Sequence, residues 1–67
     1  MAERWIRKIK KDLVANPAST RVQVASRIKT DDVSAGKALQ RLSAGANHHV
    51  DASNTLHDAT TTYTWAR

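Results

Sequence analysis

The side chains best suited to chemistry lie in the last third of the chain, where three histidines accompany two aspartates. His48, His49 and His57 could bind a metal ion through imidazole nitrogen, and Asp51 or Asp58 could add carboxylate oxygen. Neighbouring residues of a strand point to opposite faces, so His48 and His49 cannot easily share one ion. Serine is also present, but no glycine-framed nucleophile turn accompanies it. We therefore expect no metal site, no catalytic residues and no cofactor.

Chain length and composition exclude several classes of function. The 67 residues allow one small domain, spanning residues 1–67, with little room for an enclosed catalytic pocket. We therefore expect no enzyme and no small-molecule substrate. Cysteine is absent, which rules out a disulfide framework and a thiolate nucleophile and favours a cytoplasmic protein. The apolar runs are too short to span a membrane, so we expect no membrane partner.

The positive charge is concentrated in the first two-thirds of the chain. Eleven Lys and Arg against six Asp and Glu give a formal net charge of +5. Residues 1–45 hold ten Lys or Arg and four Asp or Glu, whereas residues 46–67 hold one Arg and two Asp. A basic region of this kind favours a polyanionic partner, with nucleic acid as the default. The alternative is a small protein that is merely basic.

The first amphipathic helix is predicted over residues 3–15. Its apolar residues recur at spacings of three and four, which is the period of one helix face. Lysine and arginine occupy most of the other positions. Pro17 ends the helix, because proline has no amide hydrogen and pushes Asn16 out of the α region. The residues expected to face the core are Trp5, Ile6, Ile9, Leu13 and Val14.

A second helix is predicted over residues 19–29. Ser19 or Thr20 can cap this helix by accepting a hydrogen bond from a free amide of its first turn. No glycine or proline follows it, so Thr30-Asp31-Asp32 must supply the turn to the next helix. The residues expected to face the core are Val24, Ala25 and Ile28.

A third helix is predicted over residues 32–44, with Asp31 or Asp32 as its N-cap. Gly45 follows in the position where glycine commonly ends a helix. Gly36 lies in the first half, where it lowers helix stability by roughly 1 kcal/mol relative to alanine. The residues expected to face the core are Ala35, Ala38, Leu39 and Leu42.

A β-hairpin is predicted after Gly45, where the period of the sequence changes. Threonine and aromatic residues alternate over residues 61–66, which is typical of a strand. A shorter strand is predicted around residues 48–50, and the polar, turn-prone residues 51–58 form the loop between the two strands. Because a lone hairpin is marginal in water, we expect Tyr63 and Trp65 to pack on the helices.

This order of elements resembles a winged helix-turn-helix domain over about residues 5–66. The helix-turn-helix part of the resemblance rests on Val24-Ala25-Ser26-Arg27-Ile28, Thr30-Asp31-Asp32, residues 33–39, Leu42 and Gly45. The ending Thr61-Thr62-Tyr63-Thr64-Trp65 is similar to the second wing strand of small bacterial winged-helix regulators, most of all those of pilus operons, and to small phage and plasmid regulators. Lys29 departs from the family, in which many members have glycine in the turn. The resemblance implies an α+β fold: a three-helix winged helix-turn-helix with a C-terminal β-hairpin wing.

The resemblance also implies where DNA would bind. The third helix would enter the major groove and read base edges with its outward N-terminal residues. The DNA-contacting residues would be Ser34, Gly36, Lys37, Gln40 and Arg41 in the third helix and Thr20, Arg21 and Gln23 in the second. Lys37 would donate to guanine, and Arg21 would bind phosphate at a helix N-terminus. Gly36 would either admit DNA closely or allow tight helix packing, and Arg41 would either meet phosphate or be an ordinary surface arginine.

The wing differs from the helices, because its predicted loop has no Lys or Arg. Asn54 and His57 are the side chains there that are suited to a minor-groove or phosphate contact. A wing that carries Asp51 and Asp58 should bind DNA weakly, and it could contact a protein instead.

Two functions from different classes follow. The first is sequence-specific binding of double-stranded DNA by a small cytoplasmic, nucleoid-associated transcriptional regulator, strengthened by a homodimer or a protein co-regulator because few phosphates are neutralised. The alternative is a winged-helix protein-interaction module, for example a phage protein that docks a host transcription or nucleoid protein. Such a module would use Tyr63, Trp65 or the acidic wing.

Overall fold

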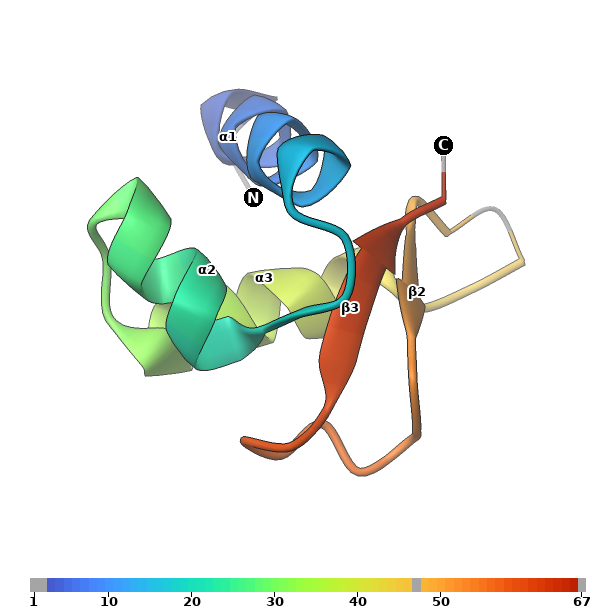
Figure 1. The fold of residues 1–67 in the computed structure, drawn as a ribbon. Coiled ribbons are helices and arrows are strands. Elements are labelled where there is room, and N and C mark those ends of the chain that lie inside the picture. The colour runs from blue at the N-terminus through green and yellow to red at the C-terminus, as the bar shows by residue number, and fades with distance from the viewer. Residues whose placement is uncertain (1–2, 47, 67) are drawn as a thin grey trace.

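Three helices and a small antiparallel sheet form the computed structural model, which describes residues 3–46 and 48–66 (Figure 1). In chain order the elements are α1 (Glu3–Ala15), β1 (Ser19–Thr20), α2 (Arg21–Ile28), α3 (Asp32–Leu42), β2 (Val50–Ala52) and β3 (Thr62–Trp65). The predicted α+β fold is confirmed, and the three helices with their C-terminal hairpin are an arrangement compatible with a winged helix.

One face of α1 covers the core. Ile9 and Leu13 are buried, and α1 packs against α2 and β3. Val14 was predicted to belong to this face, but its side chain is 60% exposed. The prediction is wrong because each residue turns a helix by about 100°, which carries Val14 past the edge of the packed face that Leu13 occupies.

The N-caps of α2 and α3 are among the residues predicted for them. The Thr20 hydroxyl accepts a hydrogen bond from the Gln23 amide at 3.3 Å, and Gln23 Oε1 accepts one from the Thr20 amide at 3.0 Å. This reciprocal pair is a capping box. Asp31 begins α3 in the same way, because its Oδ2 accepts from the Ser34 amide at 2.9 Å.

The turn between α2 and α3 forms without glycine. Lys29 adopts the left-handed conformation, with φ 61° and ψ 54°. The Thr30 amide donates to the Ala25 carbonyl at 2.9 Å, which satisfies one of the last carbonyls of α2. Lys29 therefore holds a backbone conformation that glycine adopts freely, at the cost of strain in a residue with a Cβ atom.

The third helix ends at Leu42, two residues before its predicted end. The Leu42 carbonyl accepts a hydrogen bond from the His49 amide at 2.9 Å, so the chain already turns back at this point. Gly45, with φ +86°, lies in the turn after the helix and does not close the helix directly.

The sheet has β3 in its centre, antiparallel to β1 on one side and to β2 on the other. The predicted helix over residues 19–29 begins too early, because Ser19 and Thr20 pair with Tyr63 and Thr62 as β1. Thr20 can end a strand and cap a helix at once, since its backbone is extended (φ −77°, ψ 163°) as an N-cap requires.

The hairpin is shifted relative to its prediction. β2 begins at Val50, and the loop covers residues 53–61, whereas a strand over 48–50 and a loop over 51–58 were predicted. His48 does not join the strand, because its ring bonds locally: Nδ1 lies 3.0 Å from the Gly45 carbonyl oxygen and Nε2 lies 2.7 Å from Asp51 Oδ1.

The core lies where the three helices meet the sheet. Tyr63, the largest fully buried side chain, comes from the central strand, and Trp65 packs partly buried at the edge of the same cluster. The expectation that both aromatic residues pack on the helices is confirmed. The other fully buried apolar residues include Ile9, Leu13, Val24, Leu39 and Val50.

Candidate nucleic-acid interface

The outward face of α3 is polar and exposed. Ala35, Ala38, Leu39 and Leu42 are buried on one side of this helix, and the side chains exposed on the other include Ser34, Lys37, Gln40 and Arg41. Lys37, Gln40 and Arg41 line a shallow depression of about 360 Å³ together with Ala44. Spacings of three and four residues bring these side chains onto one stripe, where their donors can reach a common surface.

Gly36 makes room for a side chain of α2. A Cβ atom at this position would lie 3.1 Å from Arg21 Cδ, so the Arg21 chain packs directly over the glycine. Of the two roles considered for Gly36, the structure supports tight packing between helices.

Arg21 joins the first turn of α2 to the hairpin loop over residues 53–61, which we call the wing loop. Its Nη1 donates to the His57 carbonyl at 3.1 Å, and its buried Nε has no partner among the described residues. The guanidinium is thus partly engaged within the protein, which limits the phosphate-binding role predicted for it. Thr20 and Gln23, predicted to contact DNA from the same turn, hold each other in the capping box.

Side chains of the wing loop are hydrogen-bonded to other groups of the loop and to β3. Asn54 Oδ1 accepts hydrogen bonds from the Leu56 amide at 2.9 Å and the Thr61 hydroxyl at 2.7 Å. His57 Nδ1 lies 2.9 Å from the Tyr63 hydroxyl, and the two rings stack. These polar atoms of the two wing residues predicted to contact DNA are therefore already used. Among the large apolar residues that the structure describes, Leu56 in this loop is the most exposed, at 72%.

Asp58 organises the other end of the loop. Its Oδ1 accepts from the Thr60 hydroxyl at 2.6 Å and from the Thr60 amide at 2.9 Å. These hydrogen bonds hold the pKa of the Asp58 carboxyl below its ordinary value. The negative charge of the wing is thus fixed at a defined position.

The aromatic residues of β3 differ in their access to partners. Tyr63 is fully buried, and this burial raises the pKa of its hydroxyl, so the idea that Tyr63 docks a partner is wrong. Trp65 is half-buried, stacks on the His49 ring at 5.6 Å between centroids, and lies 5.9 Å below Lys10 Nζ.

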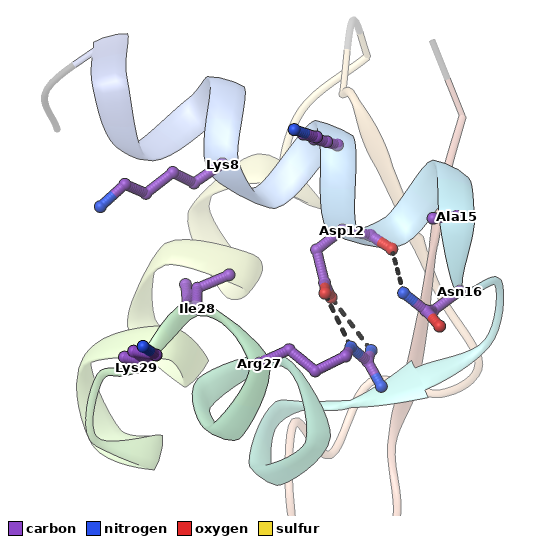
Figure 2. Close-up of a pocket in the computed structure, with 8 residues that line it drawn as sticks. Lys8, Asp12, Ala15, Asn16, Arg27, Ile28 and Lys29 are labelled. Atoms are coloured by element: carbon purple, nitrogen blue, oxygen red, sulfur yellow. Dashed lines mark hydrogen bonds and ion pairs between the residues drawn. The ribbon is translucent and has the colours of Figure 1, made fainter.

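The ion pair between Asp12 of α1 and Arg27 of α2 was not predicted from the sequence. Arg27 Nε and Nη2 donate to the two carboxylate oxygens of Asp12 at 2.7 and 3.0 Å (Figure 2). Arg27 Nη2 also donates to Ser19 Oγ at 2.6 Å. The hydrogen bonds to Asp12 raise the pKa of Arg27. Fifteen residues separate the partners, so no local spacing signals the pair. Arg27 thus contributes less to the outward positive field than its type suggests.

Two other kinds of feature are absent from the described residues. No group of three or more His, Asp or Glu residues in ranges 3–46 and 48–66 is arranged to hold a metal ion. In these ranges, no helix combines the length and apolar character that crossing a membrane requires. Comparison of the chain with protein-family models, curated proteins and solved structures finds no match.

Proposed function

We propose that the protein binds double-stranded DNA sequence-specifically, as a small transcriptional regulator of the winged-helix family with α3 in the major groove. The observation that carries this proposal is the exposed polar stripe of Ser34, Lys37, Gln40 and Arg41, opposite the buried face of the same helix. A helix fits the major groove of B-DNA, and lysine, glutamine and serine suit the hydrogen-bonding edges displayed there.

Lys37 is the residue expected to contribute most to base recognition. It is exposed in the middle of α3, and its amine can donate to O6 and N7 of guanine. Arg41 lies one turn later, where a phosphate contact is the natural role for a cation. Gln40, on the same turn, can donate to and accept from an adenine edge.

Affinity would come mainly from the helices. The wing loop over residues 53–61 has no Lys or Arg, and the polar atoms of Asn54 and His57 described above are engaged inside it. A monomer that neutralises few phosphates binds DNA modestly. We therefore propose that a homodimer or a protein co-regulator strengthens binding, and that the protein is nucleoid-associated in the cytoplasm.

Selection of bound duplexes from a random pool, followed by titration of the Lys37→Ala variant, tests the recognition helix. We expect tenfold or more weaker binding to the selected duplex and a relaxed preference at one base pair, because a good base contact is worth about 1–3 kcal/mol. Lys10→Ala removes the same charge from an exposed site on α1 and serves as the matched control.

The control should bind the selected duplex within about twofold of the parent, since one distant surface charge is largely screened by salt. A Lys37→Ala protein that binds the selected duplex as well as the parent would contradict the assignment of α3. If Lys37→Ala weakens binding equally on every duplex, Lys37 contacts phosphate and does not read a base.

Leu56 favours a second candidate function, the protein-interaction module. An apolar side chain that is 72% exposed on a braced loop without Lys or Arg suits a protein partner better than phosphate. A Leu56→Ser protein that retains full affinity for the selected duplex but loses a captured protein partner would support this candidate.

A further inference from the structure

A groove runs between α1 and the C-terminal end of α2, on a part of the surface that the DNA proposal does not use. Its volume is about 430 Å³, which lies toward the lower end of the range for ligand-binding pockets. Figure 2 shows Lys8 reaching over the groove from α1, Lys29 at the turn after α2, and Ile28 between the two helices.

The groove is strongly cationic. Its one carboxylate, Asp12, is held by both donors of Arg27, and the Asp12 side chain is only 8% exposed. The Asp12–Arg27 pair is neutral as a whole. The remaining charges of the groove are therefore those of Lys8, Lys11 and Lys29, which are all exposed on its lining. Within the described part of the chain, none of the three lysine ammonium groups has a hydrogen-bond or ion-pair partner. Three unopposed ammonium groups favour an anionic occupant.

The floor of the same groove is apolar. Ile28 packs against the hydrophobic core from α2, and Ala15 adds a methyl group from α1. The four-carbon stems of the lysines extend this hydrocarbon surface, because lysine keeps only its ammonium group in water. A sugar–phosphate backbone supplies charge but no aliphatic side chain that could pack on such a floor. An acidic peptide that contains an aliphatic residue supplies both.

We propose that this groove docks an acidic segment of a partner protein. Carboxylates of the segment pair with Lys8, Lys11 and Lys29, and an aliphatic side chain of the segment packs on Ile28. The inference does not depend on DNA binding.

The docking groove and the predicted DNA contacts of α2 lie at opposite ends of that helix. Ile28 is its last residue and Arg21 its first, which separates them by about 10 Å along the axis. The groove lining therefore shares no residue with the proposed DNA contacts.

The test is titration of the isotope-labelled full chain with two short synthetic peptides rich in aspartate and glutamate. One peptide carries a central leucine, and its twin carries serine in place of the leucine. We expect the leucine peptide to shift the backbone amide signals of Lys8, Lys11, Ile28 and Lys29 and to bind about tenfold more tightly than its twin, because burying one leucine contributes about 1.5–3 kcal/mol.

Variants locate the site. Lys8→Glu combined with Lys29→Glu should weaken the leucine peptide at least tenfold, since two attractions become repulsions. Lys10→Glu combined with Lys37→Glu makes the same total charge change outside the groove and should cost less than threefold. Thermal melts of all variants verify that they remain folded.

Three results would overturn the proposal. Equal affinity of the two peptides would mean that charge alone attracts them. Equal weakening by the control pair Lys10→Glu and Lys37→Glu would mean that the groove is not the site. A random-sequence duplex that shifts the same groove amides more strongly than the peptide would make nucleic acid the occupant.

Discussion

At the scale of single residues, Lys29 shows how one side chain can serve the fold and a surface together. Its left-handed backbone (φ 61°) costs a residue with a Cβ atom about 1–2 kcal/mol. Glycine would avoid this cost but would remove the ammonium group from the groove between α1 and α2. The lysine thus retains conformational strain at a position where its ammonium group would pair with a docked acidic segment.

Lys29→Gly is expected to raise the free energy of unfolding by about 0.5–1 kcal/mol. Glycine relieves the left-handed strain, and its greater freedom in the unfolded chain offsets part of that gain. Urea unfolding measures the change. Lys29→Ala keeps the Cβ atom and should leave stability within about 0.3 kcal/mol of the parent; a glycine variant no more stable than this control would show that the turn is unstrained.

Gly36 and Arg21 show what residue types alone could not predict. The sequence identified both as candidates for DNA contact, because a glycine on a recognition helix and an arginine at a helix start fit that role. Packing instead brings the Arg21 chain over Gly36 and its Nη1 to the His57 carbonyl. This contact joins residues far apart in the sequence, so no local pattern contains it.

At the scale of elements, the helices were predictable because each has its own local signals. The apolar spacing, Pro17 and the caps Thr20 and Asp31 each act within a few residues of where they lie. The two-residue strand β1 was missed because it exists only by pairing with β3, which follows more than forty residues later. The Asp12–Arg27 pair was missed for the same reason.

The N-cap of α3 gives stability a predictable dependence on pH. Hydrogen bonds from the Ser34 backbone and side chain hold the pKa of Asp31 below its ordinary value. The folded protein therefore binds this proton less readily than the unfolded chain, and the cap stabilises the fold at pH values above the unfolded pKa. That stabilisation is lost as pH falls through the lower, folded pKa; Asp58 acts in the same direction.

Asp31→Asn should keep the cap and reduce the loss of stability in acid, because asparagine accepts the same amide bond without titrating. Unfolding free energies from pH 7 down to pH 2 measure this. Asp31→Ala, which removes the cap, should be less stable than Asp31→Asn at neutral pH. If the asparagine variant loses stability in acid as steeply as the parent, Asp31 is not the group responsible.

At the scale of the whole molecule, the positive charge is divided among several surfaces. One cation, Arg27, is neutralised by Asp12 at the junction of α1 and α2, and another, Arg21, donates to the loop over residues 53–61. Lys37 and Arg41 remain on the exposed stripe of α3, and Lys8, Lys11 and Lys29 remain on the groove. The wing loop has no positive side chain. This distribution favours our proposal that α3 is the surface that reads DNA.

The most direct test of that claim is the affinity of the parent protein for a selected duplex and for a scrambled duplex, each measured across a range of salt concentrations. The account predicts at least a hundredfold preference for the selected duplex, and a slope of about −3 for log association constant against log salt, as expected when three or four phosphates are neutralised. Equal affinity for the two duplexes together with a slope near zero would contradict it.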